Sequence, residues 1–585
     1  MPDVTITVDG KTISCPPGEL VIEAAKRAGI YIPHFCWHPR MDPIGACRMC
    51  LVHMEPGPPK PQTACTTRVS DGMVIRTQFT DDKIKDAQEG VLEFLLINHP
   101  LDCPICDRAG ECPLQDQTQD YGPDETRYVE PKRRFAKPVP ISSLINLDRE
   151  RCILCYRCTR FCEELSGDQL IGTMQRGPRA YIFPFEGESF DSVFSGNTVQ
   201  ICPVGALTST PYRFQARPWD LRLTASTCNL CASGCNVNLN VRVADGKLVR
   251  VGSRVNEAVN EEWLCDKGRY GHAYVSSPDR LAQPWVRRDG ELQPVSWDEA
   301  LTVLTERIGP LLSDRQTDRV GLLLGGSLTD EDAYTAQKFA RMVLRTNSVD
   351  HRLDGGMAAS ALMPPALTYD DLLSADHVVV VSADLREELP LVFLRLRIAA
   401  ARKKLRLSLV HPRRVAGIEF ASAHLAPLPG SEAAVASGLA AAMGKPLAAG
   451  VEAMAASAGV STSELLSFAE ALGSGGTVIL LGPAVAADPA ALSAWNAVAD
   501  ACGARVGWAP RRAGEYGALA AGAHPELLPG WRPVADPALR SEVESAWGGP
   551  VPEQPGEDAA AVLSRARSGG LDLLWLVGAD VLGDI

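Results

Sequence analysis

Cysteines carry most of the chemistry that this sequence offers. Of its 585 residues 18 are cysteine, and 17 of these precede residue 266. The start of the sequence lacks the pattern of a signal peptide, and clustered thiols in a long chain without one are more often metal ligands than disulfides. Four separate groups in the first 270 residues have spacings suited to four iron–sulfur clusters.

The first group consists of Cys36, Cys47, Cys50 and Cys65, spaced Cys-x10-Cys-x2-Cys-x14-Cys. A long ligand loop, one Cys-x2-Cys pair and a distant fourth cysteine are typical of plant-type [2Fe–2S] sites. A four-cysteine zinc site is the alternative, but it would favour a second Cys-x2-Cys pair, which this group lacks. The spacing therefore favours a [2Fe–2S] cluster.

The second group has only three cysteines: Cys103, Cys106 and Cys112. A [4Fe–4S] cluster needs a fourth ligand, and His99 stands four residues before the first cysteine, at the end of an expected helix. A histidine at a helix end is usually a capping or surface residue, but the incomplete thiolate set favours ligation here. A neutral imidazole in place of a thiolate removes negative charge, which should raise the potential, as in Rieske centres.

The third group is the run Cys152, Cys155, Cys158 and Cys162, spaced as in bacterial two-cluster ferredoxins. In those proteins the fourth cysteine serves the other cluster and is followed by proline. Here proline follows Cys202, and the three positions where the other ligands of a second cluster would stand are not cysteine: Ser192, Ser195 and Thr198. We therefore predict one surviving [4Fe–4S] cluster, with Cys162 as a spare thiol, held by Cys152, Cys155, Cys158 and Cys202.

The fourth group is Cys228, Cys231, Cys235 and Cys265, spaced Cys-x2-Cys-x3-Cys-x29-Cys. Zinc remains an alternative on spacing alone, and the company of three other cluster sites favours a third [4Fe–4S] cluster. The two remaining cysteines outside these groups, Cys15 and Cys502, are interpreted as buried apolar residues.

The elements that position these groups follow from hydrophobic patterning. Asp9-Gly10 is a hairpin turn between two short strands, and residues 20–28 and 81–98 form helices. A strand is expected over 236–243, with a turn at Asp245-Gly246. The sequence predicts domains at 1–78, 79–121, 141–215, 221–277 and 278–585.

The cysteine-poor remainder, after residue 280, alternates short apolar runs with alanine-rich stretches. Such runs indicate buried parallel strands of a doubly wound α/β domain, starting at Val320, His377, Leu405, Thr477 and Leu573. The sequence stops just after the last of them, a poor place for a domain to end, so we expect a further C-terminal portion.

Charge, hydropathy and the motifs that are missing argue against several classes of function. The net charge of −13 gives no reason to expect nucleic-acid binding, and no apolar run reaches the ~18 residues of a membrane span. No Gly-x-Gly-x-x-Gly fingerprint or phosphate-binding loop appears, which agrees with a chain that binds neither NADH nor another nucleotide.

At this point three motifs match a known family. The stretches Pro33–Cys50, Cys103–Gln115 and Arg151–Phe161 resemble the large iron–sulfur subunit of respiratory complex I, the proton-pumping NADH:quinone oxidoreductase. The resemblance implies a β-grasp [2Fe–2S] domain and [4Fe–4S] ferredoxin-like domains in an α+β front half. It also implies electron relay from an FMN-bearing, NADH-oxidising flavoprotein partner toward quinone-side iron–sulfur subunits. The chain itself would have no catalytic residues and would lie peripherally on the cytoplasmic face of a bacterial plasma membrane, bound through partners.

The fourth group and the α/β region resemble molybdopterin oxidoreductases, with Trp263–Arg269 similar to that family's Cys-x-Lys-Gly signature. A NAD-linked formate dehydrogenase with molybdopterin is therefore the alternative function. Its metal usually takes a cysteine, selenocysteine or serine ligand, yet residues 266–501 contain no cysteine and Ser360 is the candidate that remains. We expect no molybdopterin. A hydrogenase would need a further C-terminal cysteine set, and a structural zinc protein would hold zinc at these sites.

Overall fold

A computed structural model describes residues 2–313, 317–352, 367–446, 450–473 and 475–581. The chain divides into two compact units. Unit 1 comprises Met1–Ala225, Asn238–Ser253 and Trp263–His272, whereas unit 2 comprises Ser226–Val237, Arg254–Glu262 and Ala273–Ile585. Within the described residues, no helix combines the length and the apolarity needed to span a membrane.

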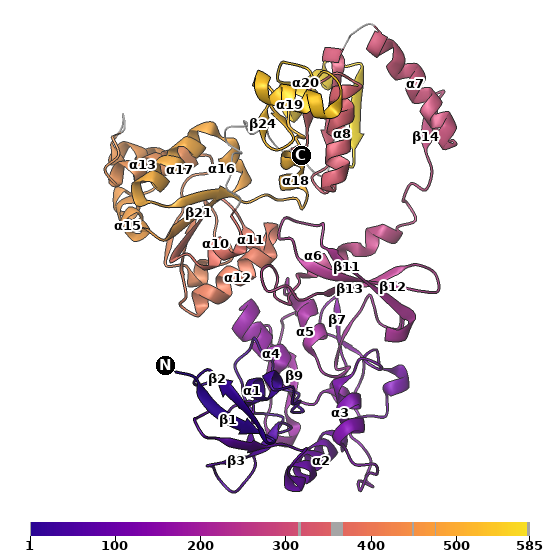
Figure 1. Ribbon diagram of the computed structural model, residues 1–585, viewed down its shortest axis with the longest axis vertical. Coiled ribbons are helices and arrows are strands. Elements are labelled where there is room, and N and C mark those ends of the chain that lie inside the picture. Colours follow the sequence, from indigo (N-terminus) through magenta and orange to yellow (C-terminus); the bar gives the residue numbers. More distant parts are fainter. Residues whose placement is uncertain (1, 314–316, 353–366, 447–449, 474, 582–585) are drawn as a thin grey trace. The chain divides into compact units, whose positions relative to one another are not determined.

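Unit 1 begins with a five-stranded sheet of order β2-β1-β5-β3-β4 and the helix α1, Val21–Arg27 (Figure 1). Asp9 and Gly10 both have positive φ values, 47° and 80°, as a tight hairpin turn requires. The turn and the helix are both as predicted. The strands are β1 (Val4–Val8), β2 (Lys11–Cys15), β3 (Leu51–Glu55), β4 (Gln62–Thr63) and β5 (Val74–Arg76).

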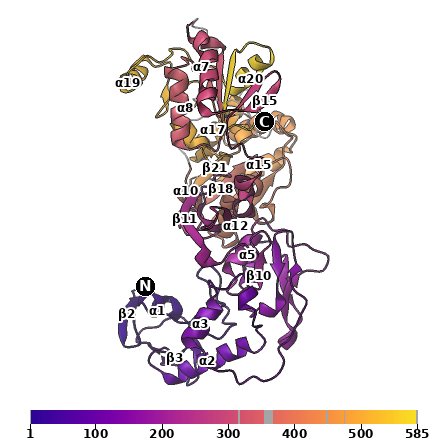
Figure 2. The ribbon, with the colours of Figure 1, turned by 90° about the vertical axis from the view of Figure 1, so that its right-hand side faces the viewer.

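The predicted helix of residues 81–98 is α2, Asp82–Leu96. Asp81 caps it by accepting a hydrogen bond from the Lys83 N–H, and the residues on its buried face recur every four positions: Ile84, Gln88 and Leu92. Helix α3 (Pro113–Tyr121) contacts α2, and the two lie close together in both views (Figures 1 and 2). The second cysteine group therefore lies in a loop between two packed helices.

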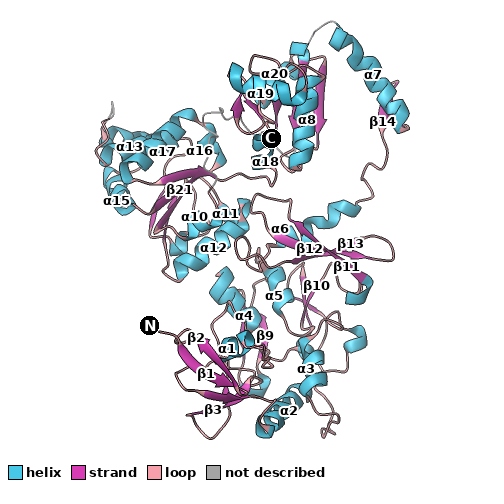
Figure 3. Cartoon of the chain, in the orientation of Figure 1, coloured by secondary structure: helices cyan, strands magenta, loops and turns pink. Residues whose placement is uncertain are grey.

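The third cysteine group lies among short elements and many loops (Figure 3). The helices there are α4 (Arg157–Arg160), a π-helical turn (Phe161–Ser166) and α5 (Ser195–Ile201). A three-stranded sheet has the order β10-β7-β6, and β8 pairs with β9 in a hairpin. These strands are β6 (Val139–Pro140), β7 (Ile145–Leu147), β8 (Ile171–Met174), β9 (Tyr181–Pro184) and β10 (Leu207–Ser209).

The fourth cysteine group is associated with a three-stranded sheet of order β11-β12-β13. The strand predicted over 236–243 is β12, Asn236–Arg242, and Gly246 in the following turn has a φ of 70°. The other elements are β11 (Leu221–Thr227), β13 (Leu248–Ser253) and α6 (Asp266–Tyr270).

Unit 2 contains the predicted parallel strands, but they form two sheets and not one. A five-stranded parallel sheet has the order β20-β19-β18-β21-β22, and a separate parallel sheet has the order β17-β16-β25. The parallel strands of the predicted α/β domain are therefore present and are divided between these two sheets. The strands are β16 (Val320–Leu324), β17 (Val349–Asp350), β18 (His377–Val381), β19 (Arg406–Val410), β20 (Ala423–Leu425), β21 (Thr477–Leu481), β22 (Arg505–Trp508) and β25 (Leu573–Val577).

Strand β25 also differs from its prediction as a buried strand. Trp575 is 36% exposed and Leu576 is 43% exposed, because β25 is an edge strand that pairs only with β16 within the described sheet. By contrast, every residue of β16, β18 and β21 is buried.

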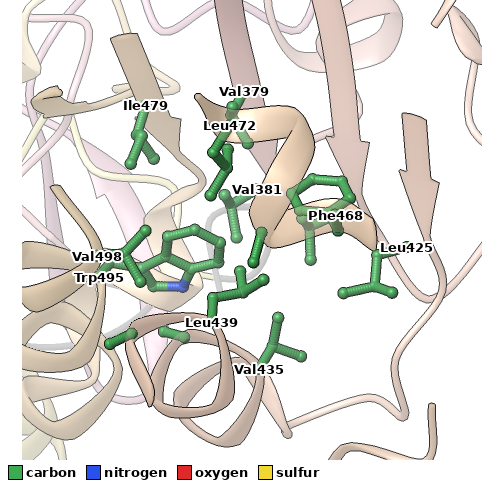
Figure 4. Packing of buried hydrophobic residues seen from close by; sticks show 14 of the residues in the cluster. Val379, Val381, Leu425, Val435, Leu439, Phe468, Leu472, Ile479, Trp495 and Val498 are labelled. Atoms are coloured by element: carbon green, nitrogen blue, oxygen red, sulfur yellow. The ribbon is translucent and has the colours of Figure 1, made fainter. Parts of the chain in front are cut away.

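An apolar core in unit 2 covers one face of the five-stranded sheet. Val379, Val381 and Ile479 of the sheet pack against Leu439 and Trp495 of the covering helices (Figure 4). Those helices are α13 (Glu432–Ala442), α15 (Thr462–Leu472) and α17 (Pro489–Cys502).

Unit 2 also contains further helices and short antiparallel strand pairs. They are β14 (Trp285–Arg288), β15 (Glu291–Pro294), α7 (Trp297–Ser313), α8 (Asp330–Met342), α10 (Tyr369–Leu373), α11 (Leu385–Glu388), α12 (Pro390–Ala401), α14 (Val451–Ala458), α16 (Pro483–Ala487), α18 (Glu515–Ala520), β23 (Leu527–Leu528), β24 (Arg532–Pro533), α19 (Pro537–Trp547) and α20 (Ala559–Arg567).

Candidate iron–sulfur sites

The first candidate site lies in the loop between α1 and β3 and just after β4. Its four thiols are all buried: Cys36, Cys47, Cys50 and Cys65. The Cys36 backbone N–H donates to Cys47 Sγ at 3.4 Å, and the Cys47 N–H donates to Cys36 Sγ at 3.5 Å. Gly45, with a φ of 60°, allows the left-handed turn that precedes Cys47.

The four thiols of this site act on one another. A hydrogen bond with Cys36, followed by burial, raises the pKa of Cys47. The pKa of Cys65 is lowered by a hydrogen bond with Cys36, but Cys50, burial and Cys47 outweigh it and raise the value to about 12. Thiols this crowded and buried ionise only beside positive charge, which iron supplies, so the residues fit a [2Fe–2S] cluster.

The second candidate site lies between α2 and α3. Cys106 and Cys112 are buried, whereas Cys103, at the start of a short 3-10 turn, is exposed. Burial raises the pKa of Cys106 and of Cys112. The three thiols therefore lie close together along the loop that joins α2 to α3.

His99 follows α2 and has an unused nitrogen. Its Nδ1 atom is buried and finds no hydrogen-bond partner among the described residues. Burial, with a smaller contribution from the Arg151 charge, lowers the pKa of His99 to about 4, so the imidazole is neutral at pH 7. A neutral ring with a free buried nitrogen is what a metal ligand requires, and a buried polar atom left unpaired is otherwise costly.

At the third candidate site, the thiols that lie together include Cys202 and not Cys162. One narrow cavity is lined by Cys152, Cys155, Cys158 and Cys202, and Cys162 does not reach it. Burial and then the neighbouring Cys155 raise the pKa of Cys152 to about 12, and Cys202 also contributes. For Cys155 the same two causes apply, with Cys202 as the neighbour, and its pKa also rises to about 12.

Cys162 lies in the π-helical turn and is fully buried. Burial, and next the Asp168 carboxylate, raise the pKa of Cys162 well above its ordinary value. The three positions of the lost second cluster are also buried and use their hydroxyls in hydrogen bonds: Ser192 with Phe194 N–H, Ser195 with Asp266, and Thr198 with the Ser195 carbonyl. Polar contacts thus fill the space of the missing ligands.

The second and third sites share a short stretch of backbone. Cys112 Sγ lies 3.7 Å from the carbonyl oxygen of Pro203. A Cβ atom on Gly205 would stand 2.2 Å from Cys106 Sγ, so only glycine permits this approach. Cys202 of the third site is therefore followed directly by backbone that packs against thiols of the second.

The fourth candidate site is only partly tested. In unit 2, the Cys228 N–H donates to the Cys235 carbonyl at 2.8 Å, which closes the loop that carries Cys231. In unit 1, Cys265 caps α6 and its Sγ accepts a hydrogen bond from the Gly268 N–H at 3.3 Å. Because Cys265 belongs to the other unit, the completed set of four stays a prediction.

Two further observations concern the alternatives. Across the ranges that the structure describes, no three His, Cys, Asp or Glu side chains are placed to share one metal ion. Ser360, the remaining candidate for a pterin-bound metal, lies outside the described residues. The two leftover thiols, Cys15 and Cys502, are buried in apolar surroundings as expected.

Sequence reasoning missed Arg151, Arg157 and Gly205, whose backbone or side chains contact the ligand loops. All three stand within five residues of a cysteine ligand, but charged residues in a loop are usually predicted to be solvated surface. Nothing in the pattern of residue types marked them as buried.

Models of known families match the chain in five successive stretches. They describe a 2Fe-2S iron–sulfur cluster binding domain (residues 2–80), an NADH-ubiquinone oxidoreductase-G iron–sulfur binding region (88–127), a ferredoxin-like domain of NADH-quinone oxidoreductase subunit 3 (142–208), a molybdopterin oxidoreductase Fe4S4 domain (221–277) and a molybdopterin oxidoreductase (280–581). They confirm the predicted fold class, with ferredoxin-like modules in front of a molybdopterin-oxidoreductase-like domain.

Curated relatives match over nearly the whole chain. The NADH-quinone oxidoreductase G subunit of Streptomyces coelicolor is 43% identical over 603 aligned positions, which cover 99% of this chain and 69% of the relative. The protein of the same name from Mycobacterium bovis is 44% identical over 589 positions, covering 98% of this chain and 69% of the relative. Subunit 3 of the Thermus thermophilus enzyme is 38% identical over 426 positions, covering 67% of this chain and 53% of the relative.

Proposed function

Because the chain belongs to the family of the NADH-quinone oxidoreductase G subunit, we propose that it relays electrons through one [2Fe–2S] and three [4Fe–4S] clusters. It is a subunit of an oxidoreductase complex, respiratory complex I, and the formate dehydrogenase alternative is not favoured by these relatives. The clusters supply one-electron carriers. The protein's own residues hold them, exclude water and set the charge around them.

The observation that carries this proposal is the grouping of donors within unit 1. Three sets of thiols are neighbours in the way that the spacing predicted, and the set with a missing thiol has His99 with a free buried nitrogen. The proposed ligands are Cys36, Cys47, Cys50 and Cys65; His99, Cys103, Cys106 and Cys112; Cys152, Cys155, Cys158 and Cys202; and Cys228, Cys231, Cys235 and Cys265.

The partners follow from membership of the complex. We expect an FMN-bearing flavoprotein that oxidises NADH on one side and iron–sulfur subunits nearer to quinone on the other. The chain would reach the cytoplasmic face of a bacterial plasma membrane only through such partners. The predicted domains, 1–78, 79–121, 141–215, 221–277 and 278–585, remain part of this proposal, as does the absence of molybdopterin.

Metal analysis tests the proposal most directly. Anaerobically purified protein should contain about 14 iron atoms per chain, with matching sulfide and no molybdenum. Stoichiometric molybdenum would support the formate dehydrogenase alternative, and a colourless sample with stoichiometric zinc would support a structural zinc protein. Either result would contradict the proposal.

A pair of serine variants tests the ligand assignment at the third site. We expect Cys162→Ser to keep that cluster's electron paramagnetic resonance (EPR) signal and Cys202→Ser to abolish it, since only Cys202 lines the cavity with the other three thiols. Loss of the signal in Cys162→Ser, or its survival in Cys202→Ser, would show that the assignment is wrong.

The histidine ligand has its own test. His99→Cys should keep a cluster at the second site but lower its midpoint potential, because a thiolate adds negative charge where the imidazole is neutral. A higher potential in this variant would contradict the charge argument.

A further inference from the structure

Two arginines flank ligands of the third site within one short run of sequence. Arg151 directly precedes Cys152, and Arg157 directly precedes Cys158. Arg151 is 2% exposed, and the Nε atom of Arg157 is buried without a hydrogen-bond partner in the described part of the chain. Removing a guanidinium group from water costs free energy unless nearby groups compensate its charge. We therefore expect each of these arginines to have compensating partners.

Arg151 connects the third site to the second. Its Nη2 donates to the Ile105 carbonyl at 3.5 Å, between two ligands of the second site, and its Nη1 donates to the Gly205 carbonyl at 3.5 Å. Its charge is shared by two carboxylates, Asp102 at 3.0 Å and Asp148 at 3.3 Å. One guanidinium therefore contacts the ligand loops of the second and third sites.

Arg157 connects the third site to the first. Its Nη2 donates to the Trp37 carbonyl at 2.7 Å, next to Cys36, and its Nη1 donates to the Ile201 carbonyl at 3.3 Å, next to Cys202. Both acceptors are neutral carbonyl groups. The ionisable side chains around this guanidinium are instead the thiols of the first and third sites.

Each arginine therefore contacts the ligand loops of two sites. Arg151 donates to carbonyl groups in the loops of the second and third sites. Arg157 donates to carbonyl groups in the loops of the first and third sites.

We propose that Arg151 and Arg157 are positioning residues that place one fixed positive charge on each side of the third site, so that each sets the potentials of that site and of one neighbour. This inference rests on the proposed electron relay. Reduction adds negative charge to a cluster, and a fixed cation in a region of low dielectric stabilises that form. Arg151 tunes the second and third sites, and Arg157 tunes the first and third.

The test is a redox titration of the assembled complex, followed by EPR, with the two charges removed separately. Arg151→Gln should lower the midpoint potentials of the second and third clusters and leave the first unchanged. Arg157→Gln should lower those of the first and third and leave the second unchanged. We expect on the order of a tenfold change in the ratio of oxidised to reduced cluster at fixed potential, about 59 mV for one electron.

Arg157→Gln should have the larger effect on the third site, because no carboxylate among the described contacts shares its charge as Asp102 and Asp148 share that of Arg151. A matched control is Arg213→Gln. Arg213 binds the same Asp148 at 2.8 Å, but its other side-chain contacts are with Thr208 and Phe214 and not with a ligand loop. Equal shifts in Arg213→Gln and Arg151→Gln would overturn the specific role of Arg151.

Two further variants separate charge from packing. Asp102→Asn removes a negative charge beside Arg151 and should raise the potentials of the second and third clusters, the opposite sign to Arg151→Gln. Arg157→Lys keeps the charge and should keep the potentials of the first and third clusters near those of the wild type, even if Arg157→Gln fails to assemble. A lower potential in either variant, or unmoved potentials in both arginine→Gln variants, would overturn the proposal.

These outcomes are distinct from failure of the proposed function. If the wild-type protein lacked the clusters, metal analysis would show it before any variant was made. If the clusters are present but their potentials ignore both arginines, the relay stands and the inference about Arg151 and Arg157 falls.

Discussion

The two units are stabilised in different ways. Unit 2 packs a continuous apolar core against its five-stranded sheet, and Trp495, Leu439 and Leu481 of that core are fully buried. Beyond its first sheet, unit 1 is largely loop, and its interior holds charged side chains such as Arg151 and Asp148 beside the thiols (Figure 3). Apolar burial alone can stabilise unit 2, whereas the loops of unit 1 have to be held by what their cysteines bind.

Removal of iron should have the largest effect on stability. It should destabilise unit 1 and leave unit 2 folded. Anaerobic treatment with a chelator should unfold the ligand loops of unit 1, because cluster binding there supplies folding free energy, on the order of 10 kcal/mol per structural site. Hydrogen exchange should show lost protection over 99–112 and 152–162 and intact protection in β18 and β21. Equal loss of protection in both units would contradict the comparison.

A cavity in the core of unit 2 should have the converse effect. Trp495→Ala should lower the free energy of unfolding of unit 2 by about 3–5 kcal/mol, since a fully buried side chain is removed. The cluster potentials should not change. The control is Trp297→Ala, because Trp297 is 70% exposed and its loss should change the stability by less than about 0.5 kcal/mol.

Unit 2 should also lose stability in acid through a buried histidine. His377 in β18 is 1% exposed, and burial, followed by the Arg406 charge, lowers its pKa from 6.5 to about 4. Between these values the unfolded chain binds a proton that the folded chain does not, so stability present above pH 6.5 falls as the pH falls toward 4. The loss should be about 3 kcal/mol in chemical denaturation. His377→Gln should flatten this profile, and identical slopes in the two proteins would refute the assignment.

The smallest effect should come from a glycine in α2. A Cβ on Gly90 would meet nothing within 4 Å, so Gly90→Ala should stabilise unit 1 by about 0.5–1 kcal/mol in thermal unfolding of the iron-loaded protein. It should not restore protection in the iron-free chain. Gly205→Ala is the contrasting variant and should cost the second cluster, because its Cβ would lie 2.2 Å from Cys106 Sγ. Rescue of iron-free unit 1 by Gly90→Ala would mean that helix propensity, and not metal, limits its stability.

Local patterns in the sequence predicted the local structure well. The Asp9-Gly10 turn, the helix α2 with its Asp81 cap, and the apolar runs at β16, β18, β19, β21 and β25 are all present. The structure also brings together thiols that the spacing had grouped in the first and third sites, and the assignment of Cys202 as a ligand stays a prediction. Each of these depends on residues whose types alone restrict the backbone or the chemistry.

Long-range pairing could not be predicted in the same way. The strands β16, β18, β21 and β25 have similar apolar patterns. Nothing in Leu573–Val577 therefore indicates that it pairs with Val320–Leu324 and not with the larger sheet. Likewise, burial of Arg151 and Arg157 depends on carbonyl groups supplied by loops far away in the sequence, such as Trp37 and Gly205. The types of these residues do not reveal those partners.

The backbone from Cys202 to Gly205 also has a consequence for damage and repair. Its first residue is a proposed ligand of the third cluster, and its last residue lets the thiol of Cys106, a proposed ligand of the second, come close. Oxidative loss of either cluster would loosen this shared stretch of backbone. The other cluster would then be exposed to the same oxidant. We expect air to destroy the two clusters at similar rates. We also expect that repair has to restore both of them together.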